Sequence, residues 1–168
     1  KLTSLIISLS DNNIWPALIL TGIACLLLGM EVPTTAAYVI CVSVAGPALV
    51  DMGLELLQVH LFVFWFALLS TITPPVCGTV FIASGMVSEN WLKVSLTSMS
   101  LGIGLYFIPL SMIANDAVIK LDSNFLHAII AFFKIAVSLV LLSYAFISNN
   151  LIILKIIAFG LGMFVMFV

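Results

Sequence analysis

The feature that most constrains this chain is the length of its uncharged runs. Residues 56–88 and 94–115 contain no Asp, Glu, Lys or Arg. A membrane-spanning helix needs about 20 mainly apolar residues to cross about 30 Å of hydrocarbon. The apolar residues are continuous rather than alternating, which favours helices over a β-barrel. We therefore predict an all-α, polytopic membrane protein, and a chain of this length allows about five or six membrane segments.

The composition excludes other classes of protein. Apolar residues make up 64% of the chain and charged residues 7%, whereas a soluble domain is about half apolar and a quarter charged. Such hydrophobicity excludes a soluble enzyme and a disordered segment. The chain has no Arg and a net charge of -2, so it lacks the basic patch of a nucleic-acid binder. The expected surroundings are a lipid bilayer.

No enzyme motif is present. The sequence contains no phosphate-binding loop, GxSxG, HExxH or CxxC pattern. Cys25, Cys41 and Cys77 all lie in apolar runs, and we interpret them as small packing residues rather than as a disulfide set. His60 and His127 are too isolated to predict a metal site. We expect no enzyme activity.

Two segments are interrupted near their middle by Gly or Pro. Apolar arms at about 15–28 and 36–49 flank a break at 29–35, and each arm is too short to cross a membrane alone. This pattern predicts a re-entrant helical hairpin over about 14–50. A second helix, over about 56–88, contains Ser70, Thr71, Thr73 and the pair Pro74–Pro75. Pro removes a backbone donor and clashes with the preceding turn, so this transmembrane helix should be broken.

The remaining segments are predicted to be ordinary spans. They cover 91–113, with Gly102, Gly104 and Pro109 inside it, then 125–147 and 151–168, separated by polar stretches at 115–124 and 148–150. We accordingly divide the chain into residues 1–90, half of a transport domain, and residues 91–168, further transmembrane helices that partly form a scaffold.

The broken segments predict a secondary transporter. Non-helical backbone at membrane depth survives only inside protein or beside a water-filled cavity. Broken helices in transporters present half-helix N-termini to anions and unwound carbonyls to cations. Neutral hydroxyl oxygens suit a hard cation such as Na⁺, and they are clustered here at Thr34, Thr35, Ser70, Thr71 and Thr73. The alternative is that Gly and Pro merely kink the spans while Ser and Thr pack between helices.

Few other polar residues stand out. Glu31 lies either beside an ion site or at the hairpin tip close to water, and we favour the tip. We interpret His60 as interfacial, and Asp51 and Glu55 as part of a solvated turn. Lys134, near the middle of the 125–147 segment, either snorkels or pairs with an acid.

Two motifs at a fixed distance resemble a known family. The first is the stretch 29–40, GMEVPTTAAYVI, and the second runs from HLFVFWF at 60–66 to LSTITPPV at 69–76, with AGPALV at 45–50 between them. This combination resembles the large membrane subunit of tripartite ATP-independent periplasmic (TRAP) transporters. The likeness is closest to the fused permeases that work with TAXI-type binding proteins, and it covers about residues 12–113.

The resemblance implies a Na⁺-coupled importer of organic acids, of the dicarboxylate, 2-oxoglutarate or glutamate type, that works by an elevator motion in the bacterial inner membrane. Its partners would be a periplasmic TAXI-type binding protein, the N-terminal half of the permease and a small membrane subunit, fused or separate. By position, Gly29, Ser70 and Thr73 would hold Na⁺. Substrate-binding residues would be Pro33, Thr34, Thr35 and Pro74. Glu31 departs from the small residue common in relatives.

The family is built on an inverted repeat, whereas this sequence carries one hairpin and one broken helix. We therefore expect the C-terminal half of a longer permease. Two alternatives stay open at this point. One is a divalent-anion symporter with a similar fold and no binding protein, and the other is a non-transporting helical membrane subunit.

Overall fold

A computed structural model describes residues 2–11, 13–30, 32–120, 125–148 and 151–167, and within them all regular structure is helical. The chain divides into two compact units, Lys1–Leu96 and Thr97–Val168. Glu31 and residues 121–124 and 149–150, for which the sequence predicted a hairpin tip, part of a loop and a turn, lie outside the described residues.

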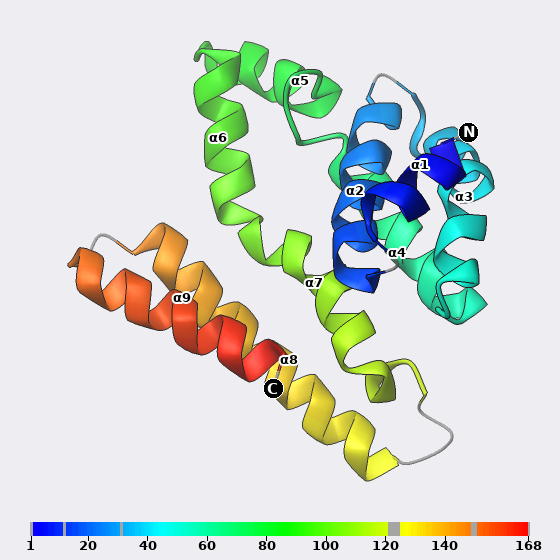
Figure 1. Ribbon diagram of the computed structural model, residues 1–168. Helices are drawn as coiled ribbons and strands as arrows, with labels where there is room; N and C mark the ends of the chain where they lie inside the picture. Colours follow the sequence, from blue (N-terminus) through cyan, green and yellow to red (C-terminus); the bar gives the residue numbers. More distant parts are fainter. Residues whose placement is uncertain (1, 12, 31, 121–124, 149–150, 168) are drawn as a thin grey trace. The chain divides into compact units, whose positions relative to one another are not determined.

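The first unit is built around three helices that all pack against one another (Figure 1). These are α2 (Ile14–Leu28), α3 (Thr34–Asp51) and α4 (Leu56–Leu69), and the short α1 (Leu2–Leu9) packs on α2 and α3. The core between them consists of small and aromatic side chains. It includes Ala17, Leu18, Cys25, Ala37, Cys41, Ala45, Ala48, Leu49, Val59, Phe62, Val63, Phe66 and Ala67.

Local capping sets the start of two of these helices. The Asn13 side chain accepts a hydrogen bond from the backbone N–H of Trp15 at 3.1 Å and begins α2. Glu55 and Gln58 form a capping box at the start of α4, in which the Glu55 N–H donates to Gln58 Oε1 at 3.0 Å. Such caps satisfy first-turn N–H groups that have no partner within the helix.

Gly22 allows α2 to approach α4 closely. A Cβ at this position would lie 3.0 Å from two ring carbons of Phe66. Small residues at helix interfaces let backbones come together, which is the usual packing device in membranes. The three cysteines are free and buried, in agreement with their interpretation from the sequence as packing residues.

Beyond α4, helical structure is interrupted and then starts again. Residues 70–77 are not α-helical, and α5 (Gly78–Val87) starts beyond them. The Pro74–Pro75 peptide bond in this gap is cis. α6 (Trp91–Leu101) begins in the first unit, where the Trp91 ring contacts Phe81 of α5 at a centroid distance of 4.9 Å. Both predicted breaks are therefore present.

In the second unit, α8 (Phe125–Ile147) and α9 (Ile152–Phe167) form a hairpin whose helices lie side by side (Figure 1). A Cβ on Gly162 would lie 3.1 Å from Leu142 Cγ and 3.2 Å from the Ser138 carbonyl oxygen, so Gly162 permits this close packing. α7 (Ile103–Ala114) and the short 3₁₀ helix η1 (Asp116–Val118) pack on α8. The Asn115 side-chain amide donates to the Met166 carbonyl of α9 at 2.8 Å.

Two details differ from the sequence prediction. The segment 91–113, predicted as an ordinary span, is bent by 42° between α6 and α7. Gly102 sits at the bend with φ -92° and ψ 14°, outside α-helical geometry, and glycine weakens a helix interior, so an interruption here costs little. The arm predicted at 36–49 extends to 18 residues as α3, so this arm is not too short to cross a membrane.

Length and composition identify two helices that can cross a membrane, α3 and α8, among the described residues. The bent pair of α6 and α7 makes a third if it forms one span. The helices α2, α4, α5 and α9 are apolar but shorter. This all-helical architecture with candidate spans is that of a polytopic membrane protein.

Candidate functional site

The two breaks meet at one cavity of about 340 Å³ in the first unit. Four helix ends contribute to its wall. Gly29 and Ser70 are the residues at which α2 and α4 end, Pro33 precedes the first residue of α3, and Gly78 begins α5. The described residues that line it are Gly29, Val32, Pro33, Ser70, Thr71, Val76, Gly78, Thr79 and Ile82.

The ends of α2 and α4 touch at Gly29 and Ser70. A Cβ placed on Gly29 would collide with the Ser70 side chain, at 2.8 Å from its Cβ, and would lie 3.0 Å from the Cys25 carbonyl oxygen. Only a residue without a side chain permits this approach. The contact joins two segments that are about 40 residues apart in the sequence, which fixes the position of one break against the other.

Hydroxyl groups satisfy the last carbonyls of α4. Ser70 Oγ donates to the Ala67 carbonyl at 2.7 Å, Thr71 Oγ1 to Leu68 at 2.8 Å, and Thr73 Oγ1 to Leu69 at 2.7 Å. A hydroxyl that donates its proton keeps two acceptor lone pairs. Ser70 and Thr73 are both buried, so these two hydroxyl groups lie away from bulk water.

Side chains from α5 and α6 hold the unwound segment after α4. Thr79 Oγ1 donates to the Thr71 carbonyl at 2.7 Å. The hydroxyl of the fully buried Ser95 in α6 donates a hydrogen bond to the Ile72 carbonyl at 3.4 Å. It accepts a hydrogen bond from the Cys77 thiol at 3.8 Å. Backbone groups without helical partners are costly in an apolar setting, and these contacts supply part of what the helix would have provided.

The electrostatics of the cavity follow from the direction of its four helices. Helix N-termini carry about half a positive charge and N–H groups that lack a partner within the helix, while C-termini carry about half a negative charge and carbonyls that lack one. α3 and α5 start at the cavity, whereas α2 and α4 end there. The arrangement can stabilise both an anion and a cation without an ionised side chain among the described lining residues.

The structure brings together some of the predicted site residues. Gly29, Pro33 and Ser70 line the cavity, and Thr73 is buried in the same break without lining it. Thr34 and Thr35 occupy the first turn of α3, with Thr34 partly exposed and Thr35 exposed, and they do not line the cavity. Pro74 is partly exposed and also lies outside the lining.

Sequence reasoning missed Thr79 and Ser95. Thr79 follows Gly78 at the first residues of α5, where the helix restarts after the Pro pair. That restart was a usable signal, because the first turn beyond a break faces the same cavity as the turn before it. Ser95 carried no signal, since only the packing of α6 on the break brings it to the Ile72 carbonyl.

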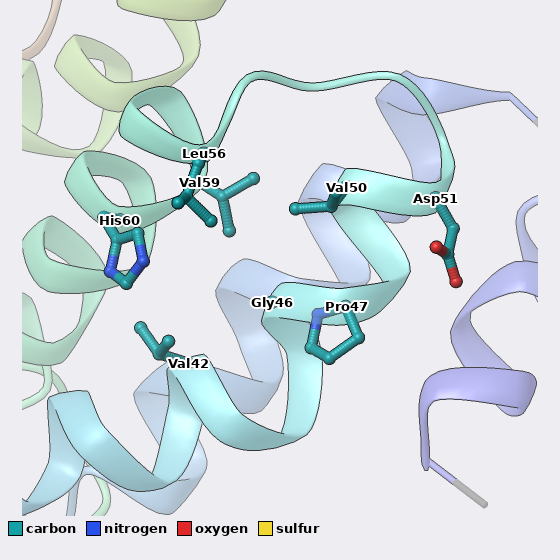
Figure 2. A pocket seen from close by; sticks show the side chains of 8 residues that line it. All are labelled: Val42, Gly46, Pro47, Val50, Asp51, Leu56, Val59 and His60. Atoms are coloured by element: carbon teal, nitrogen blue, oxygen red, sulfur yellow. The ribbon is translucent and has the colours of Figure 1, made fainter.

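A second cavity, of about 330 Å³, lies between α3 and α4 (Figure 2). Apolar side chains, including Val42, Val50 and Leu56, form most of its wall, while the Asp51 carboxylate is directed away from them. His60 lines it too, and its Nδ1 is hydrogen-bonded to Tyr38 Oη at 2.6 Å. Polar groups do not converge here as they do between the breaks.

Comparison with known proteins gives one match. The family model described as "Tripartite ATP-independent periplasmic transporter, DctM component" matches residues 1–127. The chain belongs to the DctM family. The searches of curated proteins and of solved structures gave no match.

Membership of the DctM family identifies the chain as a TRAP transporter permease of a membrane. The family is one of transporters, and it implies a periplasmic binding protein and other membrane subunits as partners. The matched residues include both breaks and the whole cavity between them, while most of α8 and all of α9 lie beyond the match. In this DctM-family chain, the cavity at which α2 and α4 end and α3 and α5 start is therefore the candidate transport site.

Proposed function

We propose that this chain forms part of a Na⁺-coupled permease that imports an organic acid delivered by a periplasmic binding protein of the TAXI type. The observation that carries the proposal is the convergence of two helix starts and two helix ends on one cavity. Such a cavity suits an anion and a cation bound together.

The cation would bind on the side where α2 and α4 end. Ser70 and Thr73 each contribute a buried hydroxyl oxygen whose proton is already donated to a carbonyl. Gly29 brings its backbone against Ser70. Neutral hydroxyl and carbonyl oxygens are suitable ligands for a hard cation, and their lack of charge favours a monovalent ion.

The carboxylate of the substrate would bind on the side where α3 and α5 start. Pro33, Thr34 and Thr35 form the beginning of α3, and Thr79 belongs to the first turn of α5. The sequence contains no Arg that could form a bidentate clamp. Recognition would then rest on backbone N–H groups, hydroxyls and the bound cation, with Pro74 shaping the unwound segment nearby.

The wider assembly follows from the same proposal. The N-terminal half of the permease would supply the second half of the substrate site, a small membrane subunit would complete the scaffold, and the transport domain would move as an elevator in the bacterial inner membrane. Dicarboxylates, 2-oxoglutarate and glutamate are the substrate types to test first.

The deciding experiment is Na⁺-dependent uptake into proteoliposomes that contain the complete transporter and its binding protein. Ser70→Ala and Thr73→Ala should raise the Na⁺ concentration needed for half-maximal uptake by about tenfold, equivalent to about 1.4 kcal/mol for one lost ligand of a charged species. Ser43→Ala is the matched control, because this exposed α3 hydroxyl bonds only to carbonyls of its own helix.

Each rival function has a distinct outcome in this assay. Uptake at full rate without any binding protein would favour a divalent-anion symporter. No uptake under any condition, with unchanged assembly of the variants, would favour a non-transporting helical subunit. An unchanged Na⁺ titration in both hydroxyl variants would contradict the assignment of the cation site.

A further inference from the structure

Lys134 lies deep within α8, the longest helix in the described part of the chain. α8 spans 23 residues, Phe125–Ile147, and Lys134 is nine residues from its start and thirteen from its end. At 1.5 Å per residue these separations are about 14 Å and about 20 Å. A lysine side chain is too short to bring its ammonium group to either end, so the group stays within the hydrocarbon if α8 spans the membrane.

No carboxylate in this part of the chain can neutralise Lys134. Residues 125–168 contain no Asp or Glu. In the described part of the chain, the ion pairs are Lys93–Glu89 and Lys120–Asp116, and both are solvent-exposed pairs four residues apart. An ammonium group at mid-depth is costly unless it is paired, and such a residue marks an interaction or a pathway in membrane proteins.

An exposed apolar face runs along α8 beside Lys134. Ile130, Phe133 and Val137 are 58%, 62% and 51% exposed, and they lie at helical spacing around Lys134. The side of α8 that packs in the second unit is a different one, which contains Ala131, Ile135, Ser138 and Leu142. A shallow cavity of about 250 Å³, lined by Ala136, Val137, Val140 and Leu141, lies on α8 as well.

We propose that this face of α8 binds an apolar membrane helix of a partner subunit that carries one Asp or Glu at mid-depth. Charge complementarity identifies the partner, because the ammonium group of Lys134 needs a carboxylate that α8 and α9 do not contain. A second copy of this chain does not fit, since none of its acidic residues lies in the middle of a described α-helix. The inference goes beyond the proposed function and does not depend on Na⁺ coupling.

The first test is site-specific photo-crosslinking in cell membranes that contain the complete transporter. A benzophenone amino acid at Val137 lies one turn from Lys134, whereas one at Phe132, 60% exposed, lies on the opposite side of α8. We expect the Val137 probe to crosslink to a membrane helix within two turns of an Asp or Glu, as mapped by mass spectrometry. Lys134→Met should reduce this yield by about threefold to tenfold, while Lys134→Arg retains it and the Phe132 probe is unaffected.

Charge exchange supplies the second test. Lys134→Glu should abolish the Val137 crosslink, and replacing the mapped carboxylate by Lys should restore it. Lys134→Met makes the span more apolar and therefore favours membrane insertion, and all yields are compared at equal amounts of membrane-inserted protein. Three results would overturn the proposal: a yield that does not change in Lys134→Met, adducts only with lipid, or adducts only with the permease polypeptide itself, whether with a second copy or with its own residues, such as those around Glu31.

Discussion

Gly29 is the residue on which the contact between the two breaks depends. Gly29→Ala places a methyl group against the Ser70 side chain, and overpacking of this kind costs about 1–3 kcal/mol. We expect the Na⁺ concentration for half-maximal uptake to rise by about tenfold. Gly85→Ala is the control, because a Cβ there meets no atom within 4 Å.

A double variant makes this prediction specific. Ser70→Gly removes the atoms that the new methyl group would meet, so Gly29→Ala with Ser70→Gly should be less impaired than the sum of the two single changes. Strict additivity would show that Gly29 acts through something other than its contact with Ser70.

Ser95 tests whether α6 stabilises the unwound segment. Ser95→Ala leaves the Ile72 carbonyl and the Cys77 thiol without this buried partner, and such a loss costs about 1–3 kcal/mol. The measurement is the thermal unfolding midpoint of the purified permease in detergent. It should fall for Ser95→Ala and stay within error for the exposed Ser43→Ala, and equal midpoints would argue against the role of Ser95.

At the residue scale, the sequence predicted which residues lie at the breaks better than it predicted which of them line the cavity. Clustered hydroxyls were sufficient to select Ser70 and Thr73, and the family resemblance added Gly29 and Pro33; all four lie at the breaks. Thr34 and Thr35 were selected for the same reason but do not line the cavity. The direction of a side chain within the first turn of a helix depends on packing, which the sequence pattern does not contain.

The helices themselves were the most predictable level. Breaks at 29–35 and after residue 70 follow from backbone chemistry, because Pro lacks an N–H and Gly weakens a helix in any surroundings. The segment 91–113 was predicted as an ordinary span, yet it bends at Gly102. Glycines at 102 and 104 are compatible with both a straight and a bent helix, so the sequence pattern alone does not distinguish the two.

The α8–α9 hairpin offers a matched pair of glycines for testing helix packing. Gly162→Leu forces a large side chain against Leu142 and the Ser138 carbonyl, whereas a Cβ on Gly160 meets no atom within 4 Å. We expect Gly162→Leu to destabilise the protein by about 1–3 kcal/mol and Gly160→Leu to have little effect. The measurement is the thermal unfolding midpoint of the two purified variants in detergent, and similar midpoints would contradict the observed packing.

At the scale of the whole molecule, the burial of all three cysteines gives a simple test of the fold. Cys25, Cys41 and Cys77 are each 0% exposed. In native membranes we expect no reaction with a maleimide-linked polymer, and a mass shift for three thiols after denaturation in detergent. Lys93→Cys is the positive control, since the Lys93 side chain is 70% exposed. Rapid native labelling of the unmodified protein would show that the helices are packed differently.

Composition determined the class of the molecule, and two spaced motifs determined the family, but neither determined the cavity. The sequence indicates that two breaks exist. It does not indicate that Gly29 and Ser70 meet, because this contact requires α2, α3 and α4 to pack on one another first. Long-range contacts of this kind are set by the shape of the whole core.

The pairing of two helix starts with two helix ends has a consequence for the energetics of crossing the membrane. Under the proposed function, the four half-charges offset one another, so the described wall of the cavity would add little net charge to a transport domain that crosses a low-dielectric layer. A cation bound alone would leave a net charge, and so would an organic acid bound alone, whereas balance is restored when the bound monovalent cations equal the net negative charges of the acid. Under the proposed function, a site that holds only the cation or only the acid would carry a net charge, and moving this charge through the membrane would be costly. This electrostatic cost alone would then enforce the stoichiometry of transport, without a separate gate.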